Sequence, residues 1–473
     1  MRIFDQAYID GAFRPVLGRE ELTLVDPTSE VETGRLRLAD AQDAKLAVDA
    51  ASRALPLWAA SSKAERIDLL NALAEAVEAR ADVLTQATIE EYGGPVEQAR
   101  WRAGLAAANF RIAAGLLADF PFTRWINQTE VVAQPVGVAL HIVPWNSVYN
   151  AISVKLAGAL AAGCPVVVKP SEFSPWQVSL LSECFHAAGA PSGLINVVTG
   201  LGPVVGEALT ADPRIRKISF TGSTPVGKSI LRASAERIQR VTLELGGKAP
   251  TIVLDDADPA QAARQALAIG FTNNGQACIA GTRILVQRGR IEAFSRAIVE
   301  AAQAIVPGDP RDPRTTLGPL VNLRQYERVG AYIRRGLEEG ARPIIGGEGR
   351  PEGLERGYFI RPTVFADVTH DMAIAREEIF GPVLCLIAYE DDEDAIRIAN
   401  DTPYGLHAYV LGRDLARARG IAARLDAGRV AINGLVHEPL APFGGFKESG
   451  IGREYGLSGI EDHLELKAIS GGA

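Results

Sequence analysis

Short β-branched runs alternate with helix-like stretches from Val131 onward, and this alternation restricts the chain to few folds. The strand-like runs lie at 136–143, 166–168, 195–199, 217–220 and 241–245. Helical stretches separate them near 148–162, 175–188, 203–210 and 225–236. Such a βαβ rhythm predicts a parallel sheet that is covered by helices on both faces.

A second alternation begins after this first one. Its strand-like runs lie at 251–254, 283–286, 383–389 and 409–411, and its helical stretches lie near 259–270, 290–305, 321–340 and 391–400. The pattern predicts a second α/β domain. A chain of 473 residues is long enough for two or three domains, each with its own core.

The remaining segments do not show the alternation of strands and helices. Residues 40–119 are predicted to be helical, with Asp40 as a cap and a capping box at 62–65. The stretches 121–134 and 463–470 are short and β-prone. Segments of this kind often pair with a neighbouring subunit, but ordinary edge strands are an equal alternative.

Composition excludes several classes of protein. The net charge of −8 and the pI near 5.5 disfavour nucleic acid and anionic membranes as partners. We also expect no signal peptide and no membrane-spanning helix. The histidines are scattered and no C-x-x-C pair occurs, so we expect no metal site and no disulfide framework. These features favour a reducing cytoplasm, where the four cysteines stay as thiols: Cys164, Cys184, Cys278 and Cys385.

Two residues near the junction of the two rhythms are candidates for chemistry. Cys278 follows a glycine-containing, loop-like stretch, where a thiol can face a cleft between domains. A lone cysteine, however, is more often a buried residue that only packs in the core. Glu244 ends a strand-like run just before Gly246 and Gly247. A carboxylate between two leucines is costly to bury unpaired, so it is either paired, exposed in a cleft, or functional.

Polar residues also follow three predicted strands. Asn146 could direct its amide at an anion, although a turn is the simpler interpretation. Lys169 and Glu172 stand where doubly wound sheets bind ligands, and an exposed salt bridge explains them equally well alone. The run 220–227 opens a helix that can receive a pyrophosphate.

The same run allows another interpretation. Lys228 and Ser229 follow Gly227 as they do in a P-loop, which would suggest a nucleoside triphosphate site. Pro225 argues against this site, because it stiffens the loop and removes one backbone N–H that would hold phosphate.

Taken together and in this order, the motifs resemble those of the aldehyde dehydrogenase superfamily from about residue 20 to residue 470. They are Pro-Trp-Asn at 144–146, Lys-Pro-Ser-Glu at 169–172, Phe-Thr-Gly-Ser-Thr at 220–224, Leu-Glu-Leu-Gly-Gly-Lys at 243–248, Gly-Gln-Ala-Cys at 275–278, Glu-Glu-Ile-Phe-Gly-Pro at 377–382 and Pro-Phe-Gly-Gly-Phe at 442–446. The spacing between Glu244 and Cys278 also resembles that of the family.

The resemblance implies a role for each matching residue. Cys278 would be the nucleophile, Glu244 the base, and Asn146 with the Cys278 backbone N–H the oxyanion hole, while Lys155 and Glu454 would relay the proton. The implied cofactor contacts are Pro144, Trp145, Lys169, Ser171, Glu172, Gly222, Ser223, Gly246, Glu378 and Phe380. The implied substrate tunnel consists of Ser147, Asn150, Val154, Ile279, His437 and Phe443.

The implied fold is α/β, with a Rossmann-like dinucleotide-binding domain, a second α/β catalytic domain and a small β oligomerisation element. The resemblance places the NAD-binding domain at 1–119 and 136–246, the catalytic domain at 247–447, and bridging segments at 120–135 and 448–473. It also implies a homodimer or homotetramer.

The implied activity is oxidation of an aldehyde to the acid with NAD, through a thiohemiacetal and a thioester. The carboxylate of Glu172 favours NAD over NADP. A tunnel with few aromatic residues favours a bulky or partly polar aldehyde, including aromatic ones, over acetaldehyde. Three alternatives remain: a coenzyme A-acylating dehydrogenase, which generally lacks the base matched by Glu244, a cysteine hydrolase without redox chemistry, and an inactive binding protein on the same scaffold.

Overall fold

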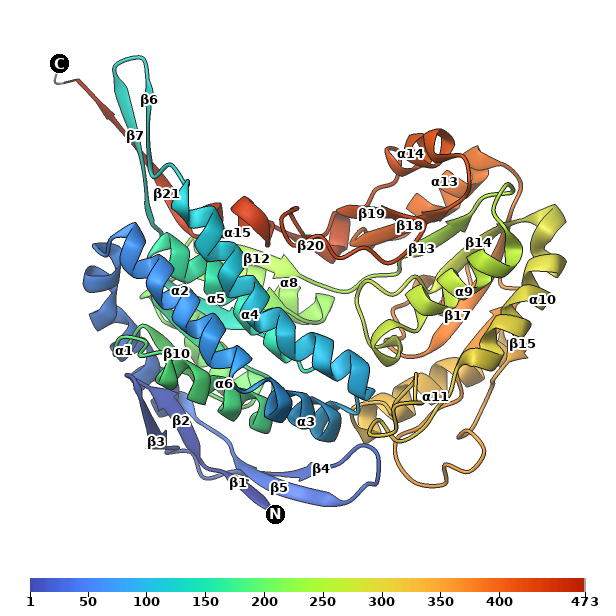
Figure 1. The fold of residues 1–473 in the computed structure, drawn as a ribbon, viewed down its shortest axis with the longest axis horizontal. Coiled ribbons are helices and arrows are strands. Elements are labelled where there is room, and N and C mark those ends of the chain that lie inside the picture. The colour runs from blue at the N-terminus through green and yellow to red at the C-terminus, as the bar shows by residue number, and fades with distance from the viewer. Residues whose placement is uncertain (472–473) are drawn as a thin grey trace.

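The first unit is built on an eight-stranded sheet (Figure 1). The computed structural model describes residues 1–471. In spatial order the strands are β20 (Gly450–Ile451), β12 (Arg240–Glu244), β11 (Ile215–Thr221), β8 (Val138–Ile142), β9 (Val166–Lys169), β10 (Ile195–Val197), β2 (Gln6–Ile9) and β3 (Ala12–Pro15). The five central strands are parallel, and β20, β2 and β3 add antiparallel edges.

Helices cover both faces of this sheet. One face packs against α2 (Lys63–Glu78), α3 (Ala81–Tyr92), α4 (Val96–Ala118), α5 (Val148–Ala162) and α6 (Pro175–Ala187). The other packs against α1 (Ala41–Ala59), α7 (Glu207–Ala211) and α8 (Thr224–Ala235). Because both faces are buried, a strand such as β9 is apolar at consecutive positions rather than at alternate ones. The predicted parallel sheet with helices on both faces is confirmed.

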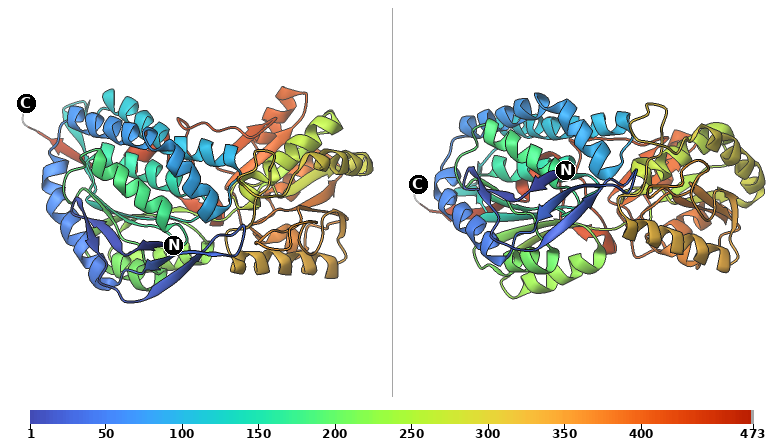
Figure 2. Two further views of the ribbon diagram at one scale, coloured as in Figure 1. Left: turned by 60° about the horizontal axis from the view of Figure 1, so that its bottom comes forward. Right: turned by 90° about the horizontal axis from the view of Figure 1, so that it is seen from below.

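The second unit holds a seven-stranded sheet and lies beside the first along the long axis (Figure 2). Its spatial order is β15 (Arg342–Ile345), β16 (Thr363–Ala366), β17 (Val383–Tyr389), β14 (Arg283–Gln287), β13 (Pro250–Val253), β18 (His407–Leu411) and β19 (Arg429–Ile432). Only β15 is antiparallel.

Helices also enclose the second sheet in two cores. One core includes residues of α11 (Leu323–Glu338), α12 (Ala373–Arg376), α13 (Asp392–Asn400) and α14 (Leu415–Ala422). The other includes residues of α9 (Pro259–Gly270) and α10 (Ile291–Ala301). The predicted second α/β domain is therefore present.

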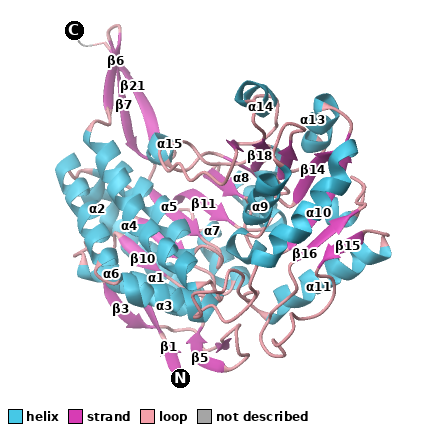
Figure 3. Cartoon of the chain, turned by 45° about the vertical axis from the view of Figure 1, so that its right-hand side comes forward, coloured by secondary structure: helices cyan, strands magenta, loops and turns pink. Residues whose placement is uncertain are grey.

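Two smaller sheets complete the fold. An arm of β6 (Thr123–Ile126), β7 (Thr129–Pro135) and β21 (Leu464–Ser470) projects from the first unit (Figure 3). A second small sheet contains β1 (Arg2–Phe4), β5 (Glu32–Arg37) and β4 (Glu21–Val25). Within the described chain, no helix is both long and apolar enough to cross a bilayer.

The structure places the predicted bridging segments in two different environments. Residues 123–135 and 464–470 pair with each other in the arm. In contrast, β20 extends the first sheet beside β12, and α15 (Gly456–Glu461) lies between that sheet and the arm (Figure 1). Residues 472–473 of the predicted 448–473 segment lie outside the described residues. The domain boundaries themselves stay a prediction.

Both predicted helix caps are present. The Asp40 side chain accepts hydrogen bonds from the backbone N–H groups of Gln42 and Asp43. In turn, the Asp43 side chain accepts a hydrogen bond from the Asp40 backbone N–H. Ser62 and Glu65 form the same reciprocal pair at the start of α2. Each box satisfies N–H groups that the first turn of a helix leaves without partners.

Candidate active site

The candidate residues of the first unit meet at one edge of its sheet. In the strand register Ile142 pairs with Lys169, and Thr221 pairs with Glu244. Because parallel strands point the same way, their carboxyl ends bring Asn146, Lys169 and Glu244 to the same side of the unit. The sheet therefore positions polar groups that are far apart in the sequence.

The loop that carries Cys278 has an unusual backbone. Asn273, Asn274 and Gly275 have φ values of 54°, 56° and 71°. Two consecutive left-handed asparagines are strained, and such strain persists only where the surroundings hold it. Asn274 Nδ2 donates to the carbonyl oxygen of Gly93 at 3.1 Å, and its Oδ1 accepts from the Gly318 backbone N–H at 2.8 Å. The loop is thus fixed by its own side chains.

Sequence reasoning missed two residues that support this loop. The Tyr92 hydroxyl donates to the Asn273 carbonyl oxygen at 2.7 Å, and Gln276 Nε2 donates to the Tyr92 oxygen at 3.2 Å. Gln276 Oε1 also accepts from the Val321 backbone N–H at 3.1 Å. The consecutive asparagines before Gly275 could have predicted a left-handed turn in this loop, since asparagine tolerates a positive φ better than most residues. Nothing in the sequence around Tyr92 indicated this role, because Tyr92 lies far from the loop along the chain.

Cys278 is the part-exposed thiol among the described cysteines, and the other three are buried. Burial, followed by the nearby charges of Glu378 and Glu244, raises the pKa of its thiol to about 12. A Cβ added to Gly247 would lie 2.3 Å from the Cys278 carbonyl oxygen, so glycine is needed where the junction approaches this loop. The thiol is neutral at rest and needs a base to become a nucleophile.

Glu244 ends β12 with only 3% of its surface exposed. Neither carboxyl oxygen has a hydrogen-bond partner among residues 1–471. Burial, followed by the charge of Glu454, raises its pKa well above the ordinary range. When it is ionised, this unpartnered carboxylate can bind water and take a proton from it.

Lys155 and Glu454 meet in a buried cluster behind Glu244. Lys155 on α5 and Glu454 form an ion pair. Ser219 on β11 donates to Glu454 Oε1 at 2.7 Å and accepts from Lys155 Nζ at 3.0 Å. Sequence reasoning named the first two residues but missed Ser219. All three groups have polar partners, which makes burial of the charges tolerable.

Asn146 lies against the Cys278 loop. Its Nδ2 donates to the Gln276 carbonyl oxygen at 2.9 Å, and Asn273 Nδ2 donates to the Asn146 carbonyl oxygen at 2.9 Å. One of the two Nδ2 hydrogens therefore fixes the amide, and the second is available to an oxygen bound near the thiol.

If Asn146 is an oxyanion donor, Asn146→Ala should lower kcat by roughly 100- to 1,000-fold, because a donor aimed at developing charge is lost. Steady-state rates with purified protein measure the effect. Asn322→Ala is a matched control, since Asn322 only caps α11 by accepting from Gln325 N–H. A rate for Asn146→Ala near that of the wild type would contradict the assignment.

The residues predicted to hold an adenosine ribose have suitable geometry. Lys169 is buried, and its nearest acidic group, Glu172, lies 3.6 Å away. Burial lowers the pKa of Lys169. Ser171 is buried in the same turn. The long Lys169–Glu172 separation leaves donors and acceptors for ribose hydroxyl groups.

The start of α8 fits a pyrophosphate. Ser223 is the N-cap residue of this helix, and its side chain makes no capping hydrogen bond. Its hydroxyl and the first N–H groups of α8 are available to a phosphate, as at other helix N-termini. Gly222 precedes it, and Pro225 occupies the first turn. The proline removes an N–H group, as expected from the sequence.

The other predicted cofactor contacts gather near the domain junction. Glu378 accepts a hydrogen bond from Gly247 N–H at 2.9 Å. A Cβ on Gly246 would lie 2.5 Å from Glu378 Oε2, so a larger residue would displace this carboxylate. The rings of Phe380 and Trp145 meet edge to face at 5.5 Å. Pro144 precedes Trp145 at the end of the β8 loop. These contacts leave the Glu378 carboxylate able to bind a second ribose.

The predicted tunnel residues are partly connected through Tyr455. The Tyr455 hydroxyl lies 2.6 Å from Asn150 Nδ2, and its ring contacts His437 and Phe443. Ile279 is held through its carbonyl oxygen by Tyr409. Ser147 is the N-cap of α5, and Val154 follows it by about two helical turns, which puts both on the same side of the helix. Sequence reasoning missed Tyr455, which follows Glu454 directly.

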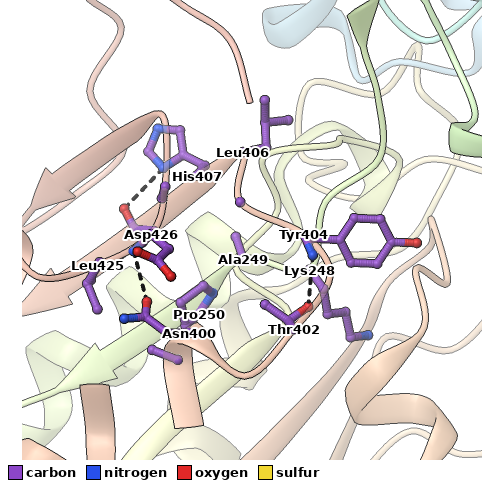
Figure 4. Close-up of a pocket in the computed structure, with 14 residues that line it drawn as sticks. Lys248, Ala249, Pro250, Asn400, Thr402, Tyr404, Leu406, His407, Leu425 and Asp426 are labelled. Atoms are coloured by element: carbon purple, nitrogen blue, oxygen red, sulfur yellow. Dashed lines mark hydrogen bonds between the residues drawn. The ribbon is translucent and has the colours of Figure 1, made fainter. Parts of the chain in front are cut away.

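A separate pocket lies at the start of β13 in the second unit (Figure 4). His407 and Asp426 stand on one side of it, and the Lys248 side chain extends away from them. Burial lowers the pKa of the Lys248 ammonium group to about 8. None of the predicted site residues lines this pocket, so we assign it no part in the chemistry.

One α/β unit carries polar groups at the carboxyl ends of its parallel strands, and through Asn146 it contacts the loop of the second unit that holds the part-exposed thiol; this arrangement defines a class of two-domain oxidoreductases. The family model for the aldehyde dehydrogenase family matches residues 16–469. The chain therefore belongs to the aldehyde dehydrogenase family, as the sequence motifs predicted.

Individual relatives agree with this assignment. The chain is 43% identical over 473 residues to 3-succinoylsemialdehyde-pyridine dehydrogenase of a Pseudomonas species, and the match covers 100% of this chain and 99% of that protein. It is 44% identical to a mutant of aldehyde dehydrogenase C from Pseudomonas syringae, a structure in complex with NAD+ and octanal, with a TM-score of 0.97 and coverage of 98% and 96%. The NAD+ complex of a Bacillus cereus aldehyde dehydrogenase has 38% identity, a TM-score of 0.95 and the same coverage. These likenesses confirm the predicted fold class.

Proposed function

We propose that this chain oxidises an aldehyde to its carboxylic acid with NAD+, with Cys278 as the covalent nucleophile and Glu244 as the base that releases the product. One observation carries the proposal: a part-exposed thiol lies near a buried carboxyl group whose oxygens have no partner among residues 1–471. The NAD+ bound in the two similar structures supports the choice of cofactor.

In the first half of the reaction, Cys278 loses its proton to solvent water, and its Sγ bonds to the aldehyde carbon. The carbonyl π electrons move to oxygen and give a thiohemiacetal alkoxide, which Asn146 Nδ2 and the Cys278 backbone N–H stabilise. NAD+ held by Lys169, Glu172, Ser223 and Glu378 would accept the hydride, and loss of this hydride would leave a thioester on Cys278.

In the second half, Glu244 takes a proton from water, and the oxygen attacks the thioester carbon. The C–S bond then breaks, the acid leaves, and the departing Cys278 thiolate takes a proton from solvent. Lys155, Ser219 and Glu454 form a buried network near Glu244, and this network would carry away the proton that Glu244 takes. Hydrolysis by water distinguishes this scheme from acyl transfer to coenzyme A.

Glu172 supports NAD+ rather than NADP+ as the cofactor. Its carboxylate lies 3.6 Å from Lys169, where it would accept hydrogen bonds from free ribose hydroxyls and repel a 2′-phosphate. With an aldehyde substrate we expect NADH and acid in equal amounts, and kcat/KM at least about tenfold higher for NAD+ than for NADP+. Absorbance of the reduced cofactor measures both. Acid without reduced cofactor would instead indicate a hydrolase.

The proposed substrate is a bulky or partly polar aldehyde. Ser147 and Asn150 supply polar groups, but Trp101 and Tyr455 contact His437, so the predicted tunnel has more aromatic neighbours than the sequence suggested. The similar 3-succinoylsemialdehyde-pyridine dehydrogenase is named for a substrate of this kind. A narrow apolar tunnel for acetaldehyde would not need these polar groups.

We further propose that the arm joins copies of this chain. All four residues of β6 are exposed, and Trp125 and Leu466 expose 66% and 64% of their surface. Exposed apolar side chains on a projecting sheet mark an association surface. The four cysteines are unpaired thiols, which supports the proposed cytoplasmic location.

A further inference from the structure

Arg102 is a cation of the first unit that forms no ion pair among the described residues. It lies on α4 at a half-buried position. Among residues 1–471, no carboxylate oxygen lies within 4.0 Å of its nitrogens. The exposed arginines of the same helix are paired, Arg100 with Glu97 at 2.8 Å and Arg111 with Glu78 at 2.6 Å. The helix therefore pairs its outer arginines and leaves the inner one without a counter-charge.

Most of the Arg102 donors have no acceptor. Nη1 donates to the Asn146 carbonyl oxygen at 3.3 Å and to Ser147 Oγ at 3.4 Å, and both bonds are long. Nε is buried without a partner in the described chain. Burial lowers the pKa of the group, but a guanidinium stays charged in proteins. The N–H groups of Nη2 have no hydrogen-bond partner among residues 1–471, and this side of the guanidinium fork can donate to a carboxylate.

The position of Arg102 connects it with the proposed site. Arg102, Asn146, Ser147 and Asn150 line one pocket. Two of these residues, Ser147 and Asn150, are predicted tunnel residues, and Asn146 is the proposed oxyanion donor. The adjacent residue, Trp101, meets the ring of His437 at 5.7 Å. A positive charge therefore lies beside the proposed oxyanion donor and two of the predicted tunnel residues.

We propose that Arg102 is a specificity residue that selects aldehydes carrying a carboxylate, which its guanidinium binds while the aldehyde carbon lies at Cys278. This inference rests on the proposed function. An anion satisfies the free donors and supplies the missing counter-charge at once, whereas a neutral acceptor satisfies only the donors. Arg102 has no step in the redox chemistry itself.

The test compares matched pairs of aldehydes that differ in charge and little in shape. The pairs are para-carboxybenzaldehyde with para-nitrobenzaldehyde, the corresponding meta isomers, and succinic semialdehyde with its methyl ester. For each pair, the ratio of kcat/KM values is measured in the wild type and in Arg102→Gln. Electronic effects of the substituents cancel when the two ratios are divided. Glutamine retains a donor for Asn146 and Ser147, which keeps the loop supported.

We expect Arg102→Gln to lower the preference for the charged member of at least one pair by roughly 10- to 100-fold, mostly through KM. Arg102→Lys should retain part of the preference, because it keeps the charge but not the fork. The matched control Arg100→Gln, on the exposed face of α4, should leave every ratio unchanged.

Two results would overturn the proposal. One is an equal loss of kcat/KM for both members of every pair, which would mean that Arg102 only supports the Asn146 loop. The other is an unchanged ratio in a folded, NAD+-binding variant. Absence of NADH with every aldehyde in the wild type would refute the proposed function itself, and this outcome is distinct from NADH formed equally well from both members of each pair.

Discussion

Cys278→Ala should abolish aldehyde oxidation, with a loss in kcat/KM of about 10⁴-fold or more. The proposed route forms a carbon–sulfur bond before hydride leaves, and a hydrated or free aldehyde is a far poorer donor without it. Alanine keeps the Cys278 backbone N–H and removes only the sulfur. The left-handed turn is held by Asn273, Asn274 and Tyr92, so the loop should keep its conformation.

The measurements are NADH formation and, separately, NAD+ binding, which should remain near the wild-type value. Cys385→Ala is the matched control, because Cys385 is buried in the core of the second unit and its Sγ donates a hydrogen bond to the Ile374 carbonyl oxygen at 3.3 Å. That variant should lose some stability and keep its activity. Substantial turnover in Cys278→Ala would show that another group forms the adduct.

The two α/β units could be predicted because their strands are buried on both faces. Such strands give apolar runs that stand out between helical stretches, and the helix expected near 148–162 matches α5. The N-terminal strands were not predicted. A signal was present in Asp10-Gly11, which have φ values of 60° and 77° and join β2 to β3 in a hairpin.

The candidate site was predictable only where a residue follows a strand or matches a motif. Asn146, Lys169 and Glu244 all stand at strand ends, so periodicity placed them at one edge of the sheet. Arg102 could not be found in this way. Its proposed role in binding a carboxylate follows from the lack of a nearby acidic side chain among the described residues, which only the folded structure shows. Tyr92 is a similar case, since its hydroxyl supports a loop that lies far along the chain.

Glu244→Gln should separate the two halves of the reaction. We expect a burst of NADH close to one equivalent per site, followed by steady turnover that is roughly 100- to 10,000-fold slower, because glutamine cannot take a proton from water. Glutamine has nearly the same shape, so the site should stay folded. Rapid mixing with NAD+ and an aldehyde measures the burst, and denatured protein should carry the acyl group on Cys278.

The pH dependence adds a second test of Glu244. Burial and the charge of Glu454 raise its pKa, so the carboxylate form is populated only as the pH rises through that raised value. Wild-type steady turnover should therefore increase with pH across this range, and the increase should disappear in Glu244→Gln. Glu448→Gln is the control, because Glu448 pairs with Lys228 at 2.9 Å on the surface and should leave both the burst and the pH profile unchanged. If Glu244→Gln gave no burst at all, Glu244 would be required before the thioester forms, and the proposed division of roles between it and Cys278 would be wrong.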